Sequence, residues 1–348
     1  MEVNRIELIE ALTKIKPGIA SKEYLEQSTH FILDNDFIIS YNDEISISYP
    51  FKIGVSCTIE EGMLYKLVSK MEEDIVSFEL KENILRIKCG DVKAKLPVVI
   101  DSQIIDYVNK LSDEHDKLDW HALPKDFIDA VKLCAFSAST DKTINMLSCV
   151  WVEGKDVLSF DKYRASWYQM EKEVQDNFYI EADHITKIGG FEDPIEYCIS
   201  KAWAHFQMGT GVVFSARLVL PDKLLDLRSK FDGFEHDTRI SLPDNLGKAV
   251  DIVALAIEKR EKLDQKITLE FGEDLIRCIG SSERGTIEQE VHLDKSLTCD
   301  PFAFEAAPRS MMEVLDKVDY LLVGKKAGMF RSKEKKGFQH MIGLIMKE

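Results

Sequence analysis

The histidines and cysteines of this chain are too widely spaced to form the common metal or nucleophile motifs. The sequence holds eight histidines and seven cysteines, with neither a His-Glu-x-x-His segment nor a Cys-x-x-Cys pair. Zinc sites draw ligands from such closely spaced residues, so we expect no metal ion. An odd number of cysteines without a close pair predicts reduced thiols in a cytoplasm rather than a disulfide framework.

Glycine-rich phosphate loops and paired catalytic carboxylates are not indicated either. Gly209-Thr210-Gly211 lacks the third glycine of a dinucleotide fingerprint and predicts a hairpin turn, and no Walker A sequence occurs. The acidic runs 72–74 and 60–61 are most simply a solvated helix end and a helix N-terminus. The sequence therefore predicts a protein that is not an enzyme and has no catalytic residue, cofactor or metal.

One local cluster of cations lies near the C-terminus, around Gly328 and Gly337. Its members are Lys325, Lys326, Arg331, Lys333, Lys335 and Lys336. Because the cluster separates two strand-like segments, it predicts first an exposed hairpin loop. A contact with nucleic acid is the alternative interpretation.

Length and composition indicate a globular protein with an acidic surface. The 348 residues are 45% hydrophobic and 30% charged, with a net charge of −16. An apolar run of about 18 residues is missing, and the N-terminus has no basic and apolar leader, so we expect a cytoplasmic protein without a membrane span. The acidity argues against a protein that grips nucleic acid by its outer surface.

The elements that must position any site recur three times. Apolar residues at helical spacing, with alanine at the fourth position, begin at Leu8, Phe127 and Leu246, which are 119 residues apart. Short strand-like segments broken by polar turns follow, such as 30–33, 37–41 and 45–50. The period predicts three α+β domains, 1–117, 118–236 and 237–348, and unrelated α+β domains are the alternative.

A second helix is expected in each repeat, followed by further strands. Thr58-Ile59-Glu60-Glu61 has the form of a capping box, residues 182–189 form a weaker signal, and Asp300-Pro301 predicts a helix start with aspartate as N-cap. In the third repeat, turns are expected at Gly272 and Gly280, between strand-like segments. Each repeat is thus predicted to be an internal doublet of one helix plus four antiparallel strands.

Three local motifs and this threefold organisation carry a resemblance that covers the whole chain. The motifs are Phe160-Asp161-Lys162-Tyr163-Arg164, residues 215–222 and residues 281–288. They resemble the Thr-Asp-Gly-His-Arg turn, the Ser-Lys-Leu…Phe-Pro-Asp-Tyr stretch and the Asn-Pro-Glu-Gln-Glu-Glu segment of the bacterial DNA polymerase III β-subunit family, the sliding clamps. Lys162 and Tyr163 replace the glycine and histidine of the first motif, which indicates a divergent member, of the kind that a phage or mobile element would encode.

The resemblance implies a ring. Two three-domain chains of that family join head to tail, with helices lining the hole and sheets outside. The ring encircles double-stranded DNA, contacts phosphates without reading sequence, and is held by topology rather than affinity. The expected function is a polymerase processivity factor, a homodimer whose partners are double-stranded DNA, a DNA polymerase and a clamp loader.

DNA contacts are then expected from cations on the predicted helices and on two loops. These residues are Arg5, Lys14, Lys16, Lys22, Lys66, Lys70, Lys132, Lys142, Lys187, Lys248, Arg309 and Lys317. Lys22 matches a family loop position that touches DNA, and Lys142 lies near the equivalent loop of the second repeat. Acidic residues share the same helices, so the expected lining is mixed: Glu7, Glu10, Asp126, Asp129 and Asp251. Solvated helix faces are the alternative for any single lysine.

The resemblance also implies a groove for short partner peptides between the second and third domains. Its expected walls are Leu147, Lys162, Tyr163, Arg164, Pro221, Leu224, Leu344, Ile345 and Met346. The family ends in Met-Pro-Met-Arg-Leu, whereas this chain ends in residues 344–348, Leu-Ile-Met-Lys-Glu, so we expect a different peptide preference. Plain core packing is the alternative for these residues.

Ring closure would pair an edge of the first repeat with an edge of the third. The expected strand Ile87–Leu96 carries Lys88, Lys93 and Lys95, and its partner region carries Glu283, Glu288 and Glu290. Opposite charges would steer head-to-tail pairing and discourage head-to-head contact.

Three rival interpretations remain open at the level of sequence. A two-domain clamp subunit that forms a trimer, as in eukaryotes and archaea, is one, although the third helix at Leu246 counts against it. The others are an enzyme or small-molecule binder built from α+β domains, and a monomeric relative that binds proteins without encircling DNA.

Overall fold

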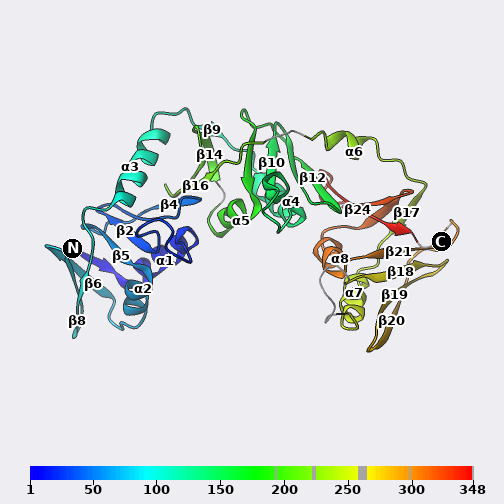
Figure 1. The fold of residues 1–348 in the computed structure, drawn as a ribbon, viewed down its shortest axis with the longest axis horizontal. Helices are drawn as coiled ribbons and strands as arrows, with labels where there is room; N and C mark the ends of the chain where they lie inside the picture. The colour runs from blue at the N-terminus through cyan, green and yellow to red at the C-terminus, as the bar shows by residue number, and fades with distance from the viewer. Residues whose placement is uncertain (193, 222–224, 258–264, 298, 347–348) are drawn as a thin grey trace. The chain divides into compact units, whose positions relative to one another are not determined.

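The computed structural model describes residues 1–348 except 193, 222–224, 258–264, 298 and 347–348 (Figure 1). Short helices alternate with antiparallel strands, which confirms the α+β class. The chain forms two compact units, Met1–Ile128 with Glu171–Leu220 and Asp129–Met170 with Pro221–Glu348. The second expected domain, 118–236, contributes residues to both units, and the division into three domains stays a prediction.

Two antiparallel sheets form the first unit, with strand orders β5-β2-β3-β4-β16-β15-β14-β9 and β1-β6-β7-β8. The strands of these sheets are β1 (Glu2–Asn4), β2 (His30–Asp34), β3 (Phe37–Tyr41), β4 (Ile45–Pro50), β5 (Ser56–Glu60), β6 (Ile75–Lys81), β7 (Ile84–Cys89), β8 (Val92–Pro97), β9 (His121–Ala122), β14 (Pro194–Ile199), β15 (Trp203–Met208) and β16 (Val213–Arg217). The unit also contains β13 (Phe178–Glu181), which belongs to neither sheet. The helices are α1 (Arg5–Ile15), η1 (Lys16–Gly18), α2 (Glu61–Ser69), α3 (Gln103–His115), α5 (Ala182–Ile185) and η4 (Thr186–Gly190). The turn expected at Gly209–Gly211 joins β15 to β16.

Local sequence explains where α1 begins and which face it buries. The side chain of Asn4 accepts hydrogen bonds from the backbone N–H groups of Ile6 and Glu7, at 2.9 and 3.2 Å, and so caps the helix. The four residues at helical spacing are fully buried: Leu8, Ala11, Leu12 and Ile15. The first predicted helix is confirmed.

The capping box expected at Thr58 is wrong. Helix α2 begins at Glu61 without a side-chain cap, and Thr58 lies within β5. The backbone N–H of Thr58 donates to the carbonyl of Val99 at 2.8 Å, and that of Val99 donates back at 3.1 Å. This pairing with a segment 41 residues away holds Thr58 in an extended strand, so its side chain cannot cap the helix.

Helix α3 was not expected, and it covers the face of the larger sheet opposite α1. Ser40 Oγ on β3 donates to the carbonyl of Ile15 at 2.6 Å, so Ser40 faces α1. Its neighbours Ile39 and Tyr41 therefore point to the other side, because side chains alternate along a strand. There α3 packs its apolar residues against the sheet, in a cluster with members Ile32, Ile39, Tyr41, Ile104, Val108, Leu111 and Trp203.

Within the second unit, hydrogen-bonded strands follow one another in the orders β10-β11-β12-β24-β23-β22-β17 and β20-β19-β18-β21-β25. The strands are β10 (Cys149–Glu153), β11 (Asp156–Phe160), β12 (Arg164–Gln169), β17 (Thr238–Ser241), β18 (Ile267–Phe271), β19 (Leu275–Ser282), β20 (Gly285–His292), β21 (Phe302–Ala306), β22 (Tyr320–Val323), β23 (Ala327–Arg331), β24 (Phe338–Gly343) and β25 (Ile345–Met346). The helices are η2 (Ala135–Ser137), η3 (Asn145–Ser148), α6 (Arg228–Asp232), α7 (Leu246–Ala254) and α8 (Pro308–Leu315); α4 (Phe127–Cys134) spans the boundary between the units in the chain.

The helix expected to start at Asp300-Pro301 is wrong, because that segment leads into a strand. Strand β21 begins at Phe302 and pairs antiparallel with β18, with Leu269 opposite Phe304. Both of these side chains are fully buried, so core packing holds the segment extended. Helix α8 starts at Pro308 instead, a proline in the first turn where a missing N–H costs nothing.

The basic cluster near the C-terminus occupies two turns rather than one hairpin loop. Residues 324–326 join β22 to β23, and residues 332–337 join β23 to β24, whereas Arg331 is the last residue of β23. The lysines of both turns are exposed, as expected.

A buried histidine lies in each unit beside a joint between strands distant in sequence, and each should make stability depend on pH. His205 Nδ1 is 2.8 Å from Ser215 Oγ, and His340 Nδ1 is 2.9 Å from Ser166 Oγ. Burial lowers the pKa of both imidazoles to about 3, aided by His115 for His205 and by Arg164 and Lys317 for His340.

We expect the free energy of unfolding to fall as the pH drops from 6.5 towards 3. In that window the unfolded chain binds protons that the folded chain excludes, at up to about 1.4 kcal/mol per pH unit for each histidine. Urea unfolding of the wild type and of His340→Gln at pH 7, 6 and 5 measures this. The variant should lose less stability on acidification, and equal slopes would contradict the prediction.

Candidate nucleic-acid interface and partner surfaces

Several of the cations expected to contact DNA are engaged within the chain. In α1 and η1, Lys14 Nζ donates to the carbonyl of Gly190 at 2.5 Å, and Lys16 pairs with Glu61 at 2.7 Å. Arg5 Nε donates to the carbonyl of Glu73, and Lys187 Nζ donates to the carbonyl of Pro17. Arg309 pairs with Glu313. Such contacts fix the side chains and partly neutralise their charge.

Five other cations of the set are exposed and make no ion pair with any residue that the structure describes. They are Lys22, after η1, Lys66 and Lys70, at the end of α2, Lys132 in α4 and Lys248 in α7. Lys142 is exposed in the loop between η2 and η3. Carboxylates at Glu7, Glu10, Asp129 and Asp251 are exposed on α1, α4 and α7, so these helices present charges of both signs. A surface of this kind would contact phosphates weakly.

Lys317, expected among the DNA contacts, is packed against the protein. Its ammonium lies 5.2 Å from the centre of the Phe136 ring and pairs with Asp316 at 2.7 Å. It also donates to the carbonyl of Glu313. These contacts partly neutralise the ammonium of Lys317, and only about a quarter of its side chain is exposed.

The motif at Asp161 forms the turn between β11 and β12. Asp161 Oδ1 accepts hydrogen bonds from the backbone N–H groups of Tyr163 and Arg164, at 2.7 and 2.9 Å. An aspartate in this position fixes a tight turn through its own side chain. The turn leaves Tyr163 69% exposed and directs Arg164 into the sheet.

Arg164 is the centre of a partly buried ionic cluster, and two of its members were not predicted from the sequence. Its guanidinium contacts Asp161 Oδ2 at 3.2 Å and Glu313 Oε2 at 2.5 Å, and it lies 5.6 Å from the centre of the Phe136 ring. Glu313 and Phe136 were missed because they lie on α8 and η2, far away in sequence. The charge of Arg164 is therefore already matched before any partner binds.

The structure brings the Asp161 turn next to the end of β24. The N–H of Gly343 donates to the carbonyl of Tyr163 at 2.8 Å, and Leu344, which follows, is buried. Ile345 and Met346 continue as β25, opposite Glu305 and Phe304. Of the other expected groove residues, Leu147 lies in η3 and is partly buried, Lys162 is exposed, Pro221 is partly buried, and Leu224 lies outside the described residues.

The two strands expected at the ring joint are both edges of their sheets. Strand β8 ends the order β1-β6-β7-β8, and β20 ends the order β20-β19-β18-β21-β25. Edge strands present unpaired backbone groups that can add a strand from another chain. All six charged residues expected at the joint are exposed: Lys88, Lys93, Lys95, Glu283, Glu288 and Glu290.

The expectation of one strand from Ile87 to Leu96 is wrong, because these residues form a hairpin. Strands β7 and β8 reverse at Gly90, whose φ of +54° suits a residue without a side chain. Lys93 then lies opposite Lys88, and Lys95 lies opposite Arg86. Like charges on adjacent strands are unfavourable, so this face of the hairpin would gain from a negative partner. Arg86 was missed in the sequence.

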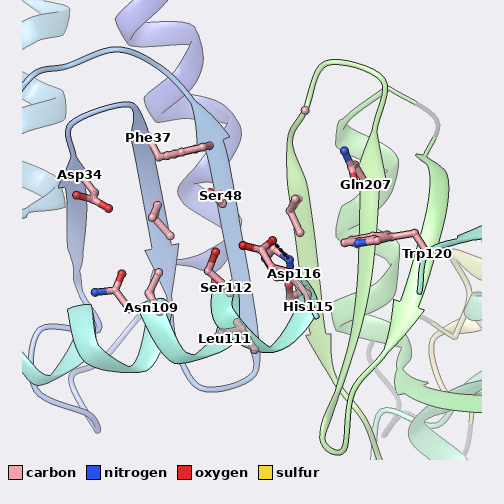
Figure 2. A pocket seen from close by; sticks show the side chains of 16 residues that line it. Asp34, Phe37, Ser48, Asn109, Leu111, Ser112, His115, Asp116, Trp120 and Gln207 are labelled. Atoms are coloured by element: carbon pink, nitrogen blue, oxygen red, sulfur yellow. Dashed lines mark ion pairs between the residues drawn. The ribbon is translucent and has the colours of Figure 1, made fainter. Parts of the chain in front are cut away.

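A polar cavity of about 350 Å³ lies between α3 and the larger sheet of the first unit (Figure 2). Figure 2 shows Ser112, His115 and Asp116 grouped near the end of α3, with Trp120 and Gln207 across the cavity. His115 Nδ1 lies 3.1 Å from Asp116 Oδ1. No group of three metal-ligating side chains occurs among the residues that the structure describes.

The Ser215–His205 pair beside this cavity is a poor catalytic dyad. Both side chains are buried, and the second imidazole nitrogen of His205 contacts Ser200 Oγ at 3.3 Å rather than a carboxylate. A base whose pKa is about 3 has little affinity for the proton of an attacking hydroxyl at neutral pH. This pair therefore contributes to packing.

The whole chain superimposes on solved sliding clamps. A DNA polymerase III β chain from Streptococcus pneumoniae matches with a TM-score of 0.81 at 16% identity, covering 99% of this chain and 98% of that one. The DNA polymerase sliding clamp from Bacillus subtilis matches with a TM-score of 0.81 at 15% identity, covering 100% and 99%. This chain has the sliding-clamp fold. A sliding clamp from Pseudomonas aeruginosa bound to griselimycin matches with a TM-score of 0.80 at 12% identity, covering 99% and 98%.

The likeness to the clamps lies in structure rather than sequence. No protein-family model matches the chain, and no curated protein matches it in sequence. No helix in the described part of the clamp fold is long and apolar enough to cross a membrane.

Proposed function

We propose that this chain is a DNA polymerase processivity factor without enzymatic activity, which forms a head-to-tail homodimeric ring around duplex DNA. The observation that carries the proposal is the match of the clamp fold over 98% or more of both chains. A ring of two chains would require three repeats in each, and a match of this extent spans all three predicted ones. A two-domain subunit would leave a third of the chain unmatched.

Charge and edge geometry support the same assembly. The cationic face of the β7–β8 hairpin lies at an edge of one sheet, and the acidic residues of β20 lie at an edge of another. Edge-to-edge addition would extend both sheets, and Lys93 and Lys95 could face Glu288 and Glu290 of a second copy. Six exposed lysines of the expected DNA set would line the hole and contact phosphates weakly enough to permit sliding: Lys22, Lys66, Lys70, Lys132, Lys142 and Lys248.

Partner peptides are proposed to bind beside the Asp161 turn, where Tyr163 and the end of β24 meet. Tyr163 offers a large exposed ring, and aromatic side chains are common anchors at interfaces. Arg164 is held by Glu313 and Asp161, so it would shape the wall of the site rather than supply a free cation. A DNA polymerase and a clamp loader are the expected owners of such peptides.

The ring is tested by topology. We expect the protein to thread onto a linear duplex with cohesive ends and to stay on it at about 0.5 M salt once ligase has closed the circle. Salt at this concentration screens phosphate contacts, so only a linked ring would remain. Gel filtration measures the protein that travels with the DNA.

Cutting the ligated circle with a restriction enzyme should release the protein, and a mock-ligated linear duplex should retain none. Equal retention on circles and linear molecules at high salt, or none on either, would contradict encirclement. Native mass spectrometry of the same sample should give twice the 39.8 kDa chain mass.

A further inference from the structure

A second surface of the first unit has the composition of a site for single-stranded nucleic acid. It is a groove of about 800 Å³ whose walls come from the 19–28 segment, the β3–β4 turn, α3, η4 and the end of β16. It is separate from the cavity of Figure 2, with which it shares no lining residue. Because η4 and α3 both contribute, the groove passes along the ends of the strands, from the side of η4 towards α3.

Aromatic rings are layered along this groove. The rings of Tyr107 and Tyr41 are stacked, with centroids 6.2 Å apart and planes 18° apart. The centre of the Tyr41 ring in turn lies 5.9 Å from the centre of the Trp203 ring. The guanidinium of Arg217 lies over the Trp203 ring, 5.1 Å from its centre. Tyr24, from the 19–28 segment, is 90% exposed although it lines the groove. An exposed tyrosine ring in a groove that also holds stacked rings is suited to receive a flat base.

Three cations line the same groove in a chain that is strongly acidic overall: Lys22, Lys187 and Arg217. Two carboxylates line the groove as well. Asp43 pairs with Arg217 at 2.5 Å and accepts a hydrogen bond from the hydroxyl of Tyr41 at 3.1 Å, and Glu44 contacts His184 Nε2 at 3.1 Å. The lining thus carries three cations against two carboxylates, a small excess of positive charge for phosphates to meet.

A buried polar atom also faces this groove without a partner. Ser28 is 1% exposed, and its Oγ has no hydrogen-bond partner among the residues that the structure describes. A buried hydroxyl left unpaired is unfavourable, so a ligand that supplies a donor or acceptor there would gain binding energy. Base edges and phosphate oxygens both meet this requirement.

We propose that this groove binds a short unpaired stretch of DNA, with a base stacked on Tyr24 and the backbone along Lys22. The inference rests on the proposed function, because a ring on primer–template DNA has single-stranded template beside it. Duplex DNA does not fit the site, since paired bases hide the faces that a tyrosine would stack on. A strand leaving the hole could pass through the groove towards α3.

The test is fluorescence anisotropy with a labelled ten-nucleotide oligo(dT) and, separately, a blunt 20-base-pair duplex. Tyr24→Ala should weaken oligo(dT) binding by roughly 5- to 150-fold, the range for loss of one base–aromatic stack, and leave duplex binding unchanged. Tyr24→Phe should bind like the wild type, because the ring carries the stacking. The matched control is Tyr163→Ala, which removes another exposed tyrosine from the second unit.

Failure of the wild type to bind oligo(dT), or equal losses for Tyr24→Ala and Tyr163→Ala, would overturn the proposal. The ligated-circle assay on Tyr24→Ala separates this result from the ring. Retention of that variant on circles, with loss of oligo(dT) binding, supports a separate single-strand site. Loss of circle retention in the wild type would overturn the ring and leave the oligo(dT) result to stand by itself.

Discussion

The double variant Lys93→Glu/Lys95→Glu is expected to be a monomer at concentrations where the wild type is a dimer. Both lysines are exposed on the edge strand β8, and the proposed partner strand β20 carries Glu288 and Glu290. The change would set four carboxylates against each other across one joint. Like-charge juxtaposition across an interface costs several kcal/mol, so we expect the dimer dissociation constant to rise by about a hundredfold or more.

Sedimentation velocity over a concentration series measures this change, and the chain offers a matched control. Lys66→Glu/Lys70→Glu makes the same change in charge at the C-terminal end of α2, which is part of neither edge strand. It should remain a dimer and lose affinity for duplex DNA, whereas the edge variant should lose both the dimer and retention on ligated circles. If the edge variant dimerises like the wild type, the joint lies elsewhere.

Charge reversal on the other side should restore the pairing. Adding Glu288→Lys/Glu290→Lys to the edge variant exchanges the signs and recreates opposite charges across the joint. Arg277 contacts Glu290 at 3.3 Å, so the exchange also places a lysine next to an arginine within β19 and β20. We therefore expect recovery of dimerisation to be partial, and complete failure to recover would indicate that backbone pairing does not bring these residues together.

The spacing of apolar residues was sufficient to predict the three recurring helices, because that pattern lies within a few neighbouring residues. Leu8, Phe127 and Leu246 each start a buried stripe, and the corresponding helices are α1, α4 and α7. The same reasoning failed where pairing with a distant strand decides the conformation. Thr58 is held by Val99, and Phe302 by Phe271, which no window of neighbouring residues contains.

Helix α3 was not predicted, although the sequence contains the pattern of a helix there. Ser102 caps it, and Ile104, Val108 and Leu111 have helical spacing, so the pattern was legible. The period was read from the first helix of each repeat and the strands that follow it, so it offered no reason to look for a helix in this segment. What the sequence could not reveal is the surface that α3 covers, since Ile39 and Trp203 join it from strands 164 residues apart.

The candidate site, like the fold, could be predicted only where its contacts lie between residues close in sequence. The Asp161 turn was found, because its hydrogen bonds lie within four residues. Its ionic partner Glu313 was not found, because α8 approaches Arg164 only through the packing of the second unit. The lysines could be enumerated from sequence, but their engagement, such as that of Lys14 by Gly190, depends on tertiary contacts.

The turn predicted at Gly280 is wrong. Replacing this glycine with alanine, the smallest possible enlargement, should lower stability substantially. The sequence suggested a turn, but β19 continues through Gly280 to Ser282, opposite Ile287 of β20. The glycine is needed for close approach: a Cβ there would overlap the carbonyl oxygen of Val253 and lie 3.4 Å from Cβ of Ala256. The end of α7 therefore rests directly on the backbone of the strand.

We expect Gly280→Ala to destabilise the second unit by about 3 kcal/mol, at the upper end for overpacking, because backbone rather than a flexible side chain must move. Differential scanning calorimetry of the whole chain measures it as a lowered transition temperature. Gly272→Ala is the matched control, in the turn between β18 and β19, since its Cβ would lie 3.6 Å from the carbonyl oxygen of Leu275, an ordinary contact. Equal transitions for the two variants would show that α7 can shift freely from β19, and the close approach would then have no role in holding the fold.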